Sequence, residues 1–143
     1  MTNPNPGQPQ APETPKDEDA IAFAQGIFQL ARNGGTAMLR PLLEAGVPAD
    51  MRTSSGDSLL MLASANGHTE TVRLLLDKDA SPDLANDRLQ TALMQAATGN
   101  HTGVISCLLA AGADRAATDA EGNTALALAQ AAAARDAEAM LEC

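Results

Sequence analysis

The sequence is nearly free of aromatic side chains, with no tryptophan, no tyrosine and only two phenylalanines among its 143 residues. Aromatic rings fill much of the centre of an ordinary compact domain. A stack of thin helical pairs is filled instead by Leu, Val, Met and Ala. The shortage of rings therefore favours a stack of small helical units, and the length corresponds to one domain.

Clustered positive charge is also missing from this chain. The formal net charge is −9, and no run of Lys or Arg occurs. Most of the surface would therefore repel a phosphate backbone or an anionic membrane. Nucleic acids and membranes are not expected as ligands.

Cysteine is scarce, with only Cys107 and Cys143 in the chain. Two cysteines do not make a disulfide framework, and Cys107 lies in an apolar helical pattern where a small buried hydrophobic side chain is expected. This usage is typical of a reducing compartment.

Sequence motifs of catalysis are absent, since no G-x-S-x-G, P-loop, H-E-x-x-H or paired-cysteine pattern occurs. His68 and His101 fall on successive copies of a repeat, too far apart for one metal ion, so a structural role is expected. Asp114, Asp119 and Glu121 share one loop but lack the spacing of a calcium loop. We predict no enzymatic activity, no cofactor and no metal site.

The sequence does contain a repeat with a period of 33 residues. Equivalent positions carry the same type of residue in successive copies. The aligned sets are Ser58, Thr91 and Thr124; Leu60, Leu93 and Leu126; Leu42, Leu75 and Leu108; and His68 with His101.

Each copy has the pattern of two short helices followed by a polar loop. In the central copy, Leu93 and Ala97 mark one helical face, and Ile105 and Leu108 mark a second. The pair at 99–100 supplies a left-handed residue that ends the first helix. The predicted N-caps of the second helices are Thr36, Thr69 and Thr102.

This pattern resembles the ankyrin repeat. The matching features are the T-A-L-M or T-A-L-A string, the Gly/Asn-His turn, the V-x-x-L-L second helix and the closing G-A-D; the family's usual T-P-L-H is not kept. The resemblance implies an all-α solenoid of about four helix-turn-helix units with hairpin-like loops. The predicted units are 20–56, 57–89, 90–122 and 123–143, and residues 1–19 are a separate tail.

The tail is rich in proline and ends in a run of charges, so we predict that it is disordered. It lacks the basic start and apolar core of a signal peptide, and the apolar run at 20–31 is too short to span a membrane. A cytoplasmic location is therefore predicted. Two interpretations of the tail remain open: a flexible leader, or a segment for partner binding or export.

The first unit departs from the pattern of the others. Asp19 is predicted to cap a helix from Ala20 to Arg32. Its predicted inward side chains are Phe23, Ile27, Leu30 and Ala31. Pro41 is predicted to kink the second helix, which should run from Thr36 to Ala45.

The middle units should supply the core, and the last unit should close the stack. The predicted buried residues are Leu60, Leu62, Ala63, Val72, Leu75, Leu76, Leu93, Ala96, Ala97, Ile105, Leu108 and Leu109. In the last unit a helix break at 131–134 is predicted from the period alone. Glu138 and Glu142 replace apolar residues of the preceding copy, so a polar outer face is expected there.

The resemblance implies that a partner is bound by the loop tips and by the exposed side of the first helices, which line a concave groove. The predicted contact positions are Ser54, Ser55, Asp57, Met61, Ala65, Asp87, Arg88, Gln90, Met94, Thr98, Ala120, Glu121, Asn123 and Ala127. Arg88 is their only cation, so a partner with a basic patch would be attracted. Met61 and Met94 could instead fill gaps between units, and packing is the favoured interpretation.

We therefore predict a monomeric adaptor or inhibitor that binds another protein. The groove has no Tyr or Trp, which are common hot-spot residues, so moderate affinity is expected. The alternative is an exported, host-directed effector that uses the same groove.

Overall fold

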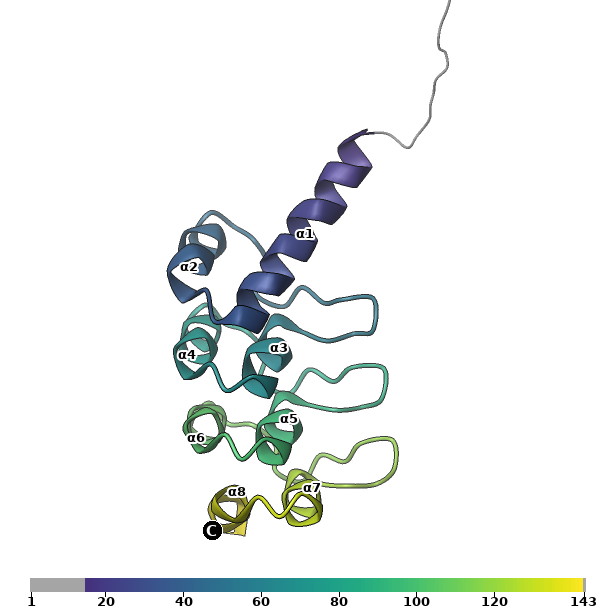
Figure 1. The fold of residues 1–143 in the computed structure, drawn as a ribbon, viewed down its shortest axis with the longest axis vertical. Coiled ribbons are helices and arrows are strands. Elements are labelled where there is room, and N and C mark those ends of the chain that lie inside the picture. The colour runs from purple at the N-terminus through teal and green to yellow at the C-terminus, as the bar shows by residue number, and fades with distance from the viewer. Residues whose placement is uncertain (1–14, 143) are drawn as a thin grey trace, which may run out of the picture.

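The computed structural model describes residues 15–142, and these form eight α-helices in four pairs (Figure 1). The predicted all-α architecture of about four helix-turn-helix units is confirmed. The helices are α1 (Pro15–Asn33), α2 (Thr36–Glu44), α3 (Leu59–Ala65), α4 (Thr69–Asp77), α5 (Ala92–Thr98), α6 (Thr102–Ala110), α7 (Ala125–Ala131) and α8 (Arg135–Glu142).

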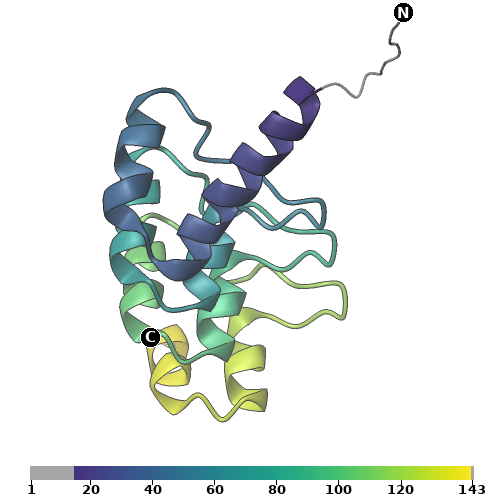
Figure 2. The ribbon, with the colours of Figure 1, turned by 45° about the horizontal axis from the view of Figure 1, so that its top comes forward.

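The pairs stack in chain order and form two layers. Helices α1, α3, α5 and α7 pack in sequence in one layer, and α2, α4, α6 and α8 form the other. Three long loops leave the stack on the side of the first layer (Figure 2). We call the side formed by these loops and the first layer the loop side. Each unit contacts its neighbours along the chain, as expected of a solenoid.

Short polar signals fix the ends of the helices in each copy. Ser58, Thr91 and Thr124 are the N-caps of α3, α5 and α7, and each side chain accepts a hydrogen bond from the backbone three residues on. The predicted caps of the second helices are wrong by one position. Thr36, Thr69 and Thr102 are the first helical residues, and the capping positions before them make no side-chain cap.

A left-handed residue ends the first helix of every pair, as the period predicts. The positions are Gly34, Gly67, Asn100 and Ala133, with φ between +57° and +74°. The break that was predicted in the last unit from the period alone is therefore present, since α7 ends at Ala131. Only this unit forces an alanine into a conformation that favours glycine.

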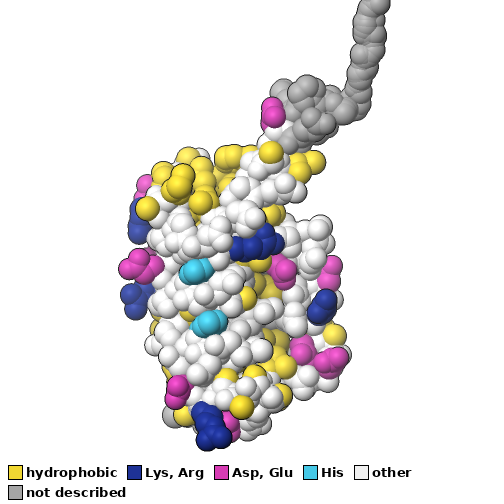
Figure 3. Space-filling view, viewed as in Figure 1, with side chains coloured by type: hydrophobic (Ala, Val, Ile, Leu, Met, Phe, Trp, Pro, Cys, Tyr) yellow, Lys and Arg dark blue, Asp and Glu magenta, His cyan; other side chains and the backbone are white. Residues whose placement is uncertain are grey.

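The histidines connect successive units, in agreement with the structural role predicted for them. His68 Nε2 donates to the carbonyl of Arg32 at 2.7 Å, and His101 Nε2 donates to the carbonyl of Ala65 at 3.1 Å. Figure 3 shows the two rings one above the other along the stack. A Cβ at Gly34 or Gly67 would come within 2.7 Å of the ring of the next unit, so glycine leaves room for the ring.

The core lies between the units. Ten of the twelve residues predicted to be buried are buried, whereas Leu76 and Leu109 are half-buried. The prediction missed other core residues because a middle helix has neighbours on both sides: the six positions 59–64 of α3 are all buried. A pattern with one apolar face underestimates such burial.

The first unit differs most from expectation. Helix α1 begins at Pro15 rather than at Ala20, so the predicted tail overlaps it, and residues 1–14 lie outside the described part. Proline is well suited to the first helical position. Phe23 is 55% exposed because no described helix covers it, so its predicted inward position is wrong. Helix α2 continues through Pro41, and the kink there remains a prediction.

Candidate functional site

Three loop tips on the loop side share one construction. We define them as the first tip (residues 53–57), the second tip (86–90) and the third tip (119–123). In each tip one side-chain oxygen accepts hydrogen bonds from two backbone N–H groups, two and four residues further on. The acceptors are Thr53 Oγ1, at 3.3 and 3.1 Å, Asn86 Oδ1, at 2.9 Å twice, and Asp119 Oδ1, at 2.9 Å twice.

Backbone hydrogen bonds join each tip to the next. The N–H of Asp87 donates to the carbonyl of Ser55 at 3.1 Å, and the N–H of Ala120 donates to the carbonyl of Arg88 at 3.0 Å. Asn86 Nδ2 also donates to Asp57 Oδ1 at 2.9 Å. The three tips therefore form a connected row rather than three independent loops.

Asp119 in the third tip has a lowered pKa. The backbone hydrogen bond from Asn123 is the main cause that holds the pKa of this carboxyl below its ordinary value, with a second from Glu121, and desolvation opposes them only in part. The charged carboxylate is thus used to hold the turn.

The first and second tips enclose a groove with a volume of about 320 Å³. Five of the predicted contact positions line it, from two successive units: Ser55, Asp57, Asp87, Arg88 and Gln90. Gln95 of α5 completes the wall and donates from Nε2 to Gln90 Oε1 at 3.3 Å. Most polar groups of the wall are thus held in place by one another.

The side chain of Arg88 in this wall is not held in this way. It is exposed, and no hydrogen bond or ion pair of its guanidinium is found within residues 15–142. A free cation beside a preformed groove is available to a negatively charged or carbonyl-bearing group of a ligand.

A second hollow, of about 440 Å³, lies between α1 and the first tip. Only Ser54 of the predicted contact positions lines it, together with Thr53 and six residues of α1: Ile21, Ala24, Gln25, Phe28, Gln29 and Arg32. The sequence prediction omitted α1. The 33-residue period could have identified these positions of α1. Ile21, Phe28 and Arg32 stand 33 residues before Ser54, Met61 and Ala65, which are predicted contact positions.

The fourteen predicted contact positions differ in the exposure of their side chains. Met61 and Met94 are each only 2% exposed, so their prediction as contact residues is wrong and the alternative of packing between units is confirmed. The other twelve keep exposed or half-buried side chains. Those that line neither hollow are Ala65, Thr98, Ala120, Glu121, Asn123 and Ala127.

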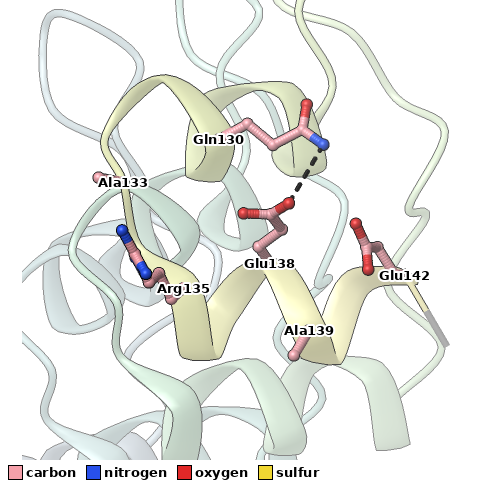
Figure 4. A pocket seen from close by; sticks show the side chains of 6 residues that line it. All are labelled: Gln130, Ala133, Arg135, Glu138, Ala139 and Glu142. Atoms are coloured by element: carbon pink, nitrogen blue, oxygen red, sulfur yellow. Dashed lines mark hydrogen bonds between the residues drawn. The ribbon is translucent and has the colours of Figure 1, made fainter.

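The hollow at the C-terminal end has a different character (Figure 4). It encloses about 490 Å³ and is lined by residues of the last unit alone. Gln130 Nε2 donates to Glu138 Oε2 at 3.5 Å, and Glu142 lies on the same face. This is the polar outer face that the sequence predicts. It lies on the last described unit, apart from the row of tips.

Comparisons with known proteins agree with this architecture. The family model of ankyrin repeats, in three copies, matches residues 27–119. A protein of Pseudomonas aeruginosa that is named as an ankyrin repeat protein is 44% identical over 54 residues, which is 38% of this chain. The match spans about a third of that relative's length. None of the described helices is long and apolar enough to cross a membrane.

Proposed function

This chain belongs to the ankyrin repeat family, and from that membership we propose that it is a non-enzymatic adaptor or inhibitor that binds one protein partner on its loop side. Ankyrin repeats are generally protein-binding modules and are typically non-catalytic. The proposal gives this general role a place on the molecule, the groove between the first and second tips.

The observation that carries the proposal is the meeting of five predicted contact positions in that groove. They come from two units and are brought together by hydrogen bonds between the tips. Their side chains are not needed for the core. A groove whose walls are already ordered loses little conformational entropy when a ligand binds.

The charge of the groove indicates what the partner offers. Asp57 and Asp87 stand against Arg88 alone, and the chain carries a net charge of −9. A partner with a basic surface would be attracted over a distance, and this affects the rate of association more than the final affinity. Arg88 would then select one electronegative group at the contact.

The exported effector remains an alternative that uses the same groove. The N-terminal residues that would distinguish it, 1–14, lie outside the described part of the chain. The cytoplasmic location and the monomeric state also remain predictions.

The test combines capture and charge reversal. The full chain is used to capture a partner from its native cells, the partner is identified by mass spectrometry, and its affinity for purified variants is measured by calorimetry. Arg88→Glu, Asp87→Lys and Gln90→Ala should each change the dissociation constant by about threefold or more. Arg88→Glu and Asp87→Lys should change the free energy of unfolding by no more than about 0.5 kcal/mol, because both side chains are exposed. Gln90→Ala also removes the hydrogen bonds that Gln90 Oε1 accepts from Asn86 and Gln95, and it should cost about 1 kcal/mol.

Arg135→Glu is the matched control. Arg135 is also exposed and lines the hollow at the C-terminal end, so this substitution changes the net charge by the same amount as Arg88→Glu. It should leave the affinity unchanged. If the two reversals have equal effects, or if none of the three groove variants changes the affinity, the partner does not bind between the first and second tips.

A further inference from the structure

Each tip contains one residue in the left-handed region of backbone conformation. In the first and third tips this residue is glycine, with φ of +86° at Gly56 and +84° at Gly122. In the second tip it is Leu89, with φ of +62°. A leucine is strained in this conformation because its Cβ approaches its own backbone, whereas glycine has no Cβ.

The side chain of Leu89 does not compensate for that strain by packing. It is 53% exposed, and it belongs neither to the buried core nor to the partly buried apolar side chains that pack against the core. Leu89 therefore destabilises the free protein in two ways, through a strained backbone and through an apolar surface in water.

The backbone around Leu89 is nevertheless held on both sides. Its own N–H donates to the carbonyl of Asn86 at 2.9 Å, and the tip is hydrogen-bonded to the first tip through Asp87 and to the third through Arg88. The leucine is thus presented from a fixed position in the middle of the row. It directly follows Arg88, whose guanidinium projects without a partner in the described residues.

We propose that Leu89 is the apolar anchor of the loop side, and that its ligand is a segment of a partner protein in which an apolar side chain covers Leu89 while a neighbouring acidic side chain pairs with Arg88. This inference rests on the proposed function and adds the chemistry of the bound segment. Burial of the exposed apolar surface contributes favourable free energy to binding, and the ordered backbone keeps the entropic cost low.

The test uses a library of short random peptides displayed on phage, selected on the full chain. The selected peptides should place Leu, Ile, Met or Phe beside Asp or Glu. One such peptide is synthesised and its affinity is measured by calorimetry. Leu89→Gly should weaken binding by about tenfold or more, and Leu89→Met, which keeps an apolar side chain, should retain most of the affinity.

Two controls separate binding from folding. Met38→Ala removes an apolar side chain that is 67% exposed on the first unit and should leave the affinity unchanged. Leu89→Gly should leave the melting temperature unchanged or raise it by about 2 to 4 °C, because strain is removed. A clear fall in melting temperature would overturn the proposal, since Leu89 would then support the fold.

The outcomes also distinguish this proposal from the one on which it rests. If Leu89→Gly binds the peptide as well as the parent does while Arg88→Glu binds it more weakly, the groove remains the binding site and Leu89 is not its anchor. If no peptide is selected, Leu89 is not an anchor for such a segment, and the groove is then decided by the captured partner alone. If none of the tip substitutions changes the affinity for the peptide or for the partner, both proposals fail.

Discussion

The interior of the stack and the row of loop tips follow the same period but differ in what is repeated. In the interior the side chains themselves recur, as at Leu42, Leu75 and Leu108. In the tips the backbone geometry recurs while the side chains change, because Thr53, Asn86 and Asp119 make the same two hydrogen bonds. We therefore expect the interior to set stability, and the variable side chains of the tips agree with their proposed role in the choice of partner.

The largest effect should come from the interior. Leu75 and Leu108 are both fully buried, and Leu75→Ala or Leu108→Ala should lower the free energy of unfolding by about 2 to 5 kcal/mol through lost apolar burial and the cavity left behind. Denaturant unfolding followed by circular dichroism measures this difference. Ala120→Ser in the third tip is the control and should change little. A Leu75→Ala protein as stable as the parent would contradict the division between interior and tips.

Removing the histidine hydrogen bonds between units should lower the free energy of unfolding by a smaller amount. His101→Ala removes the hydrogen bond to the carbonyl of Ala65, and we expect a loss of about 1 kcal/mol because water can reach that carbonyl. His68→Ala should behave alike, since its ring makes the equivalent bond to Arg32. Equilibrium unfolding of both variants tests this. A loss as large as that of Leu108→Ala would mean that the rings also carry core packing.

The architecture was predictable because its signals are local and repeated. Ser58, Thr91 and Thr124 mark the starts of the first helices, and glycine or asparagine marks most of their ends. Agreement among copies separates such signals from chance. In the last unit it predicted the helix break at 131–134, where the alanines themselves give no sign of one.

The missed features depend on contacts between units. Leu59 and Ala92 were not predicted to be buried, and they are buried because a middle helix has two neighbours. Phe23 is exposed because no described helix covers it. A groove lies between the first and second tips, and the period alone does not show that this pair of tips encloses a hollow. The left-handed backbone of Leu89 is not evident from a leucine, although the aligned positions are Gly56 and Gly122.

Backbone strain at a position outside the loop tips should be removable without loss of stability or of affinity. Ala133 is left-handed at the end of α7, where the earlier units have Gly34, Gly67 and Asn100. Ala133→Gly should therefore raise the free energy of unfolding by about 1 kcal/mol. Thermal unfolding measures the gain, and affinity for the selected peptide should not change. A destabilised variant would show that the loss of chain entropy exceeds the relief of strain.

The smallest effect should be a difference in acid sensitivity between the second and third tips, which have the same hydrogen bonds. Asp119 holds the third tip with a carboxylate, and Asn86 holds the second with a neutral amide. Because the pKa of Asp119 is lowered in the folded protein from an ordinary value of 3.8, its contribution to stability is present above that value and is lost as the pH falls through the lower folded pKa.

Asp119→Asn should keep the turn, since Asn86 already holds the second tip in the same way. The melting temperature of the variant should consequently fall less between pH 5 and pH 2 than that of the parent, about the range over which such a carboxyl takes up its proton. Parallel pH profiles for the parent and Asp119→Asn would mean that the turn is held by its backbone alone, and the tips would then owe their shared shape to the hydrogen bonds between them.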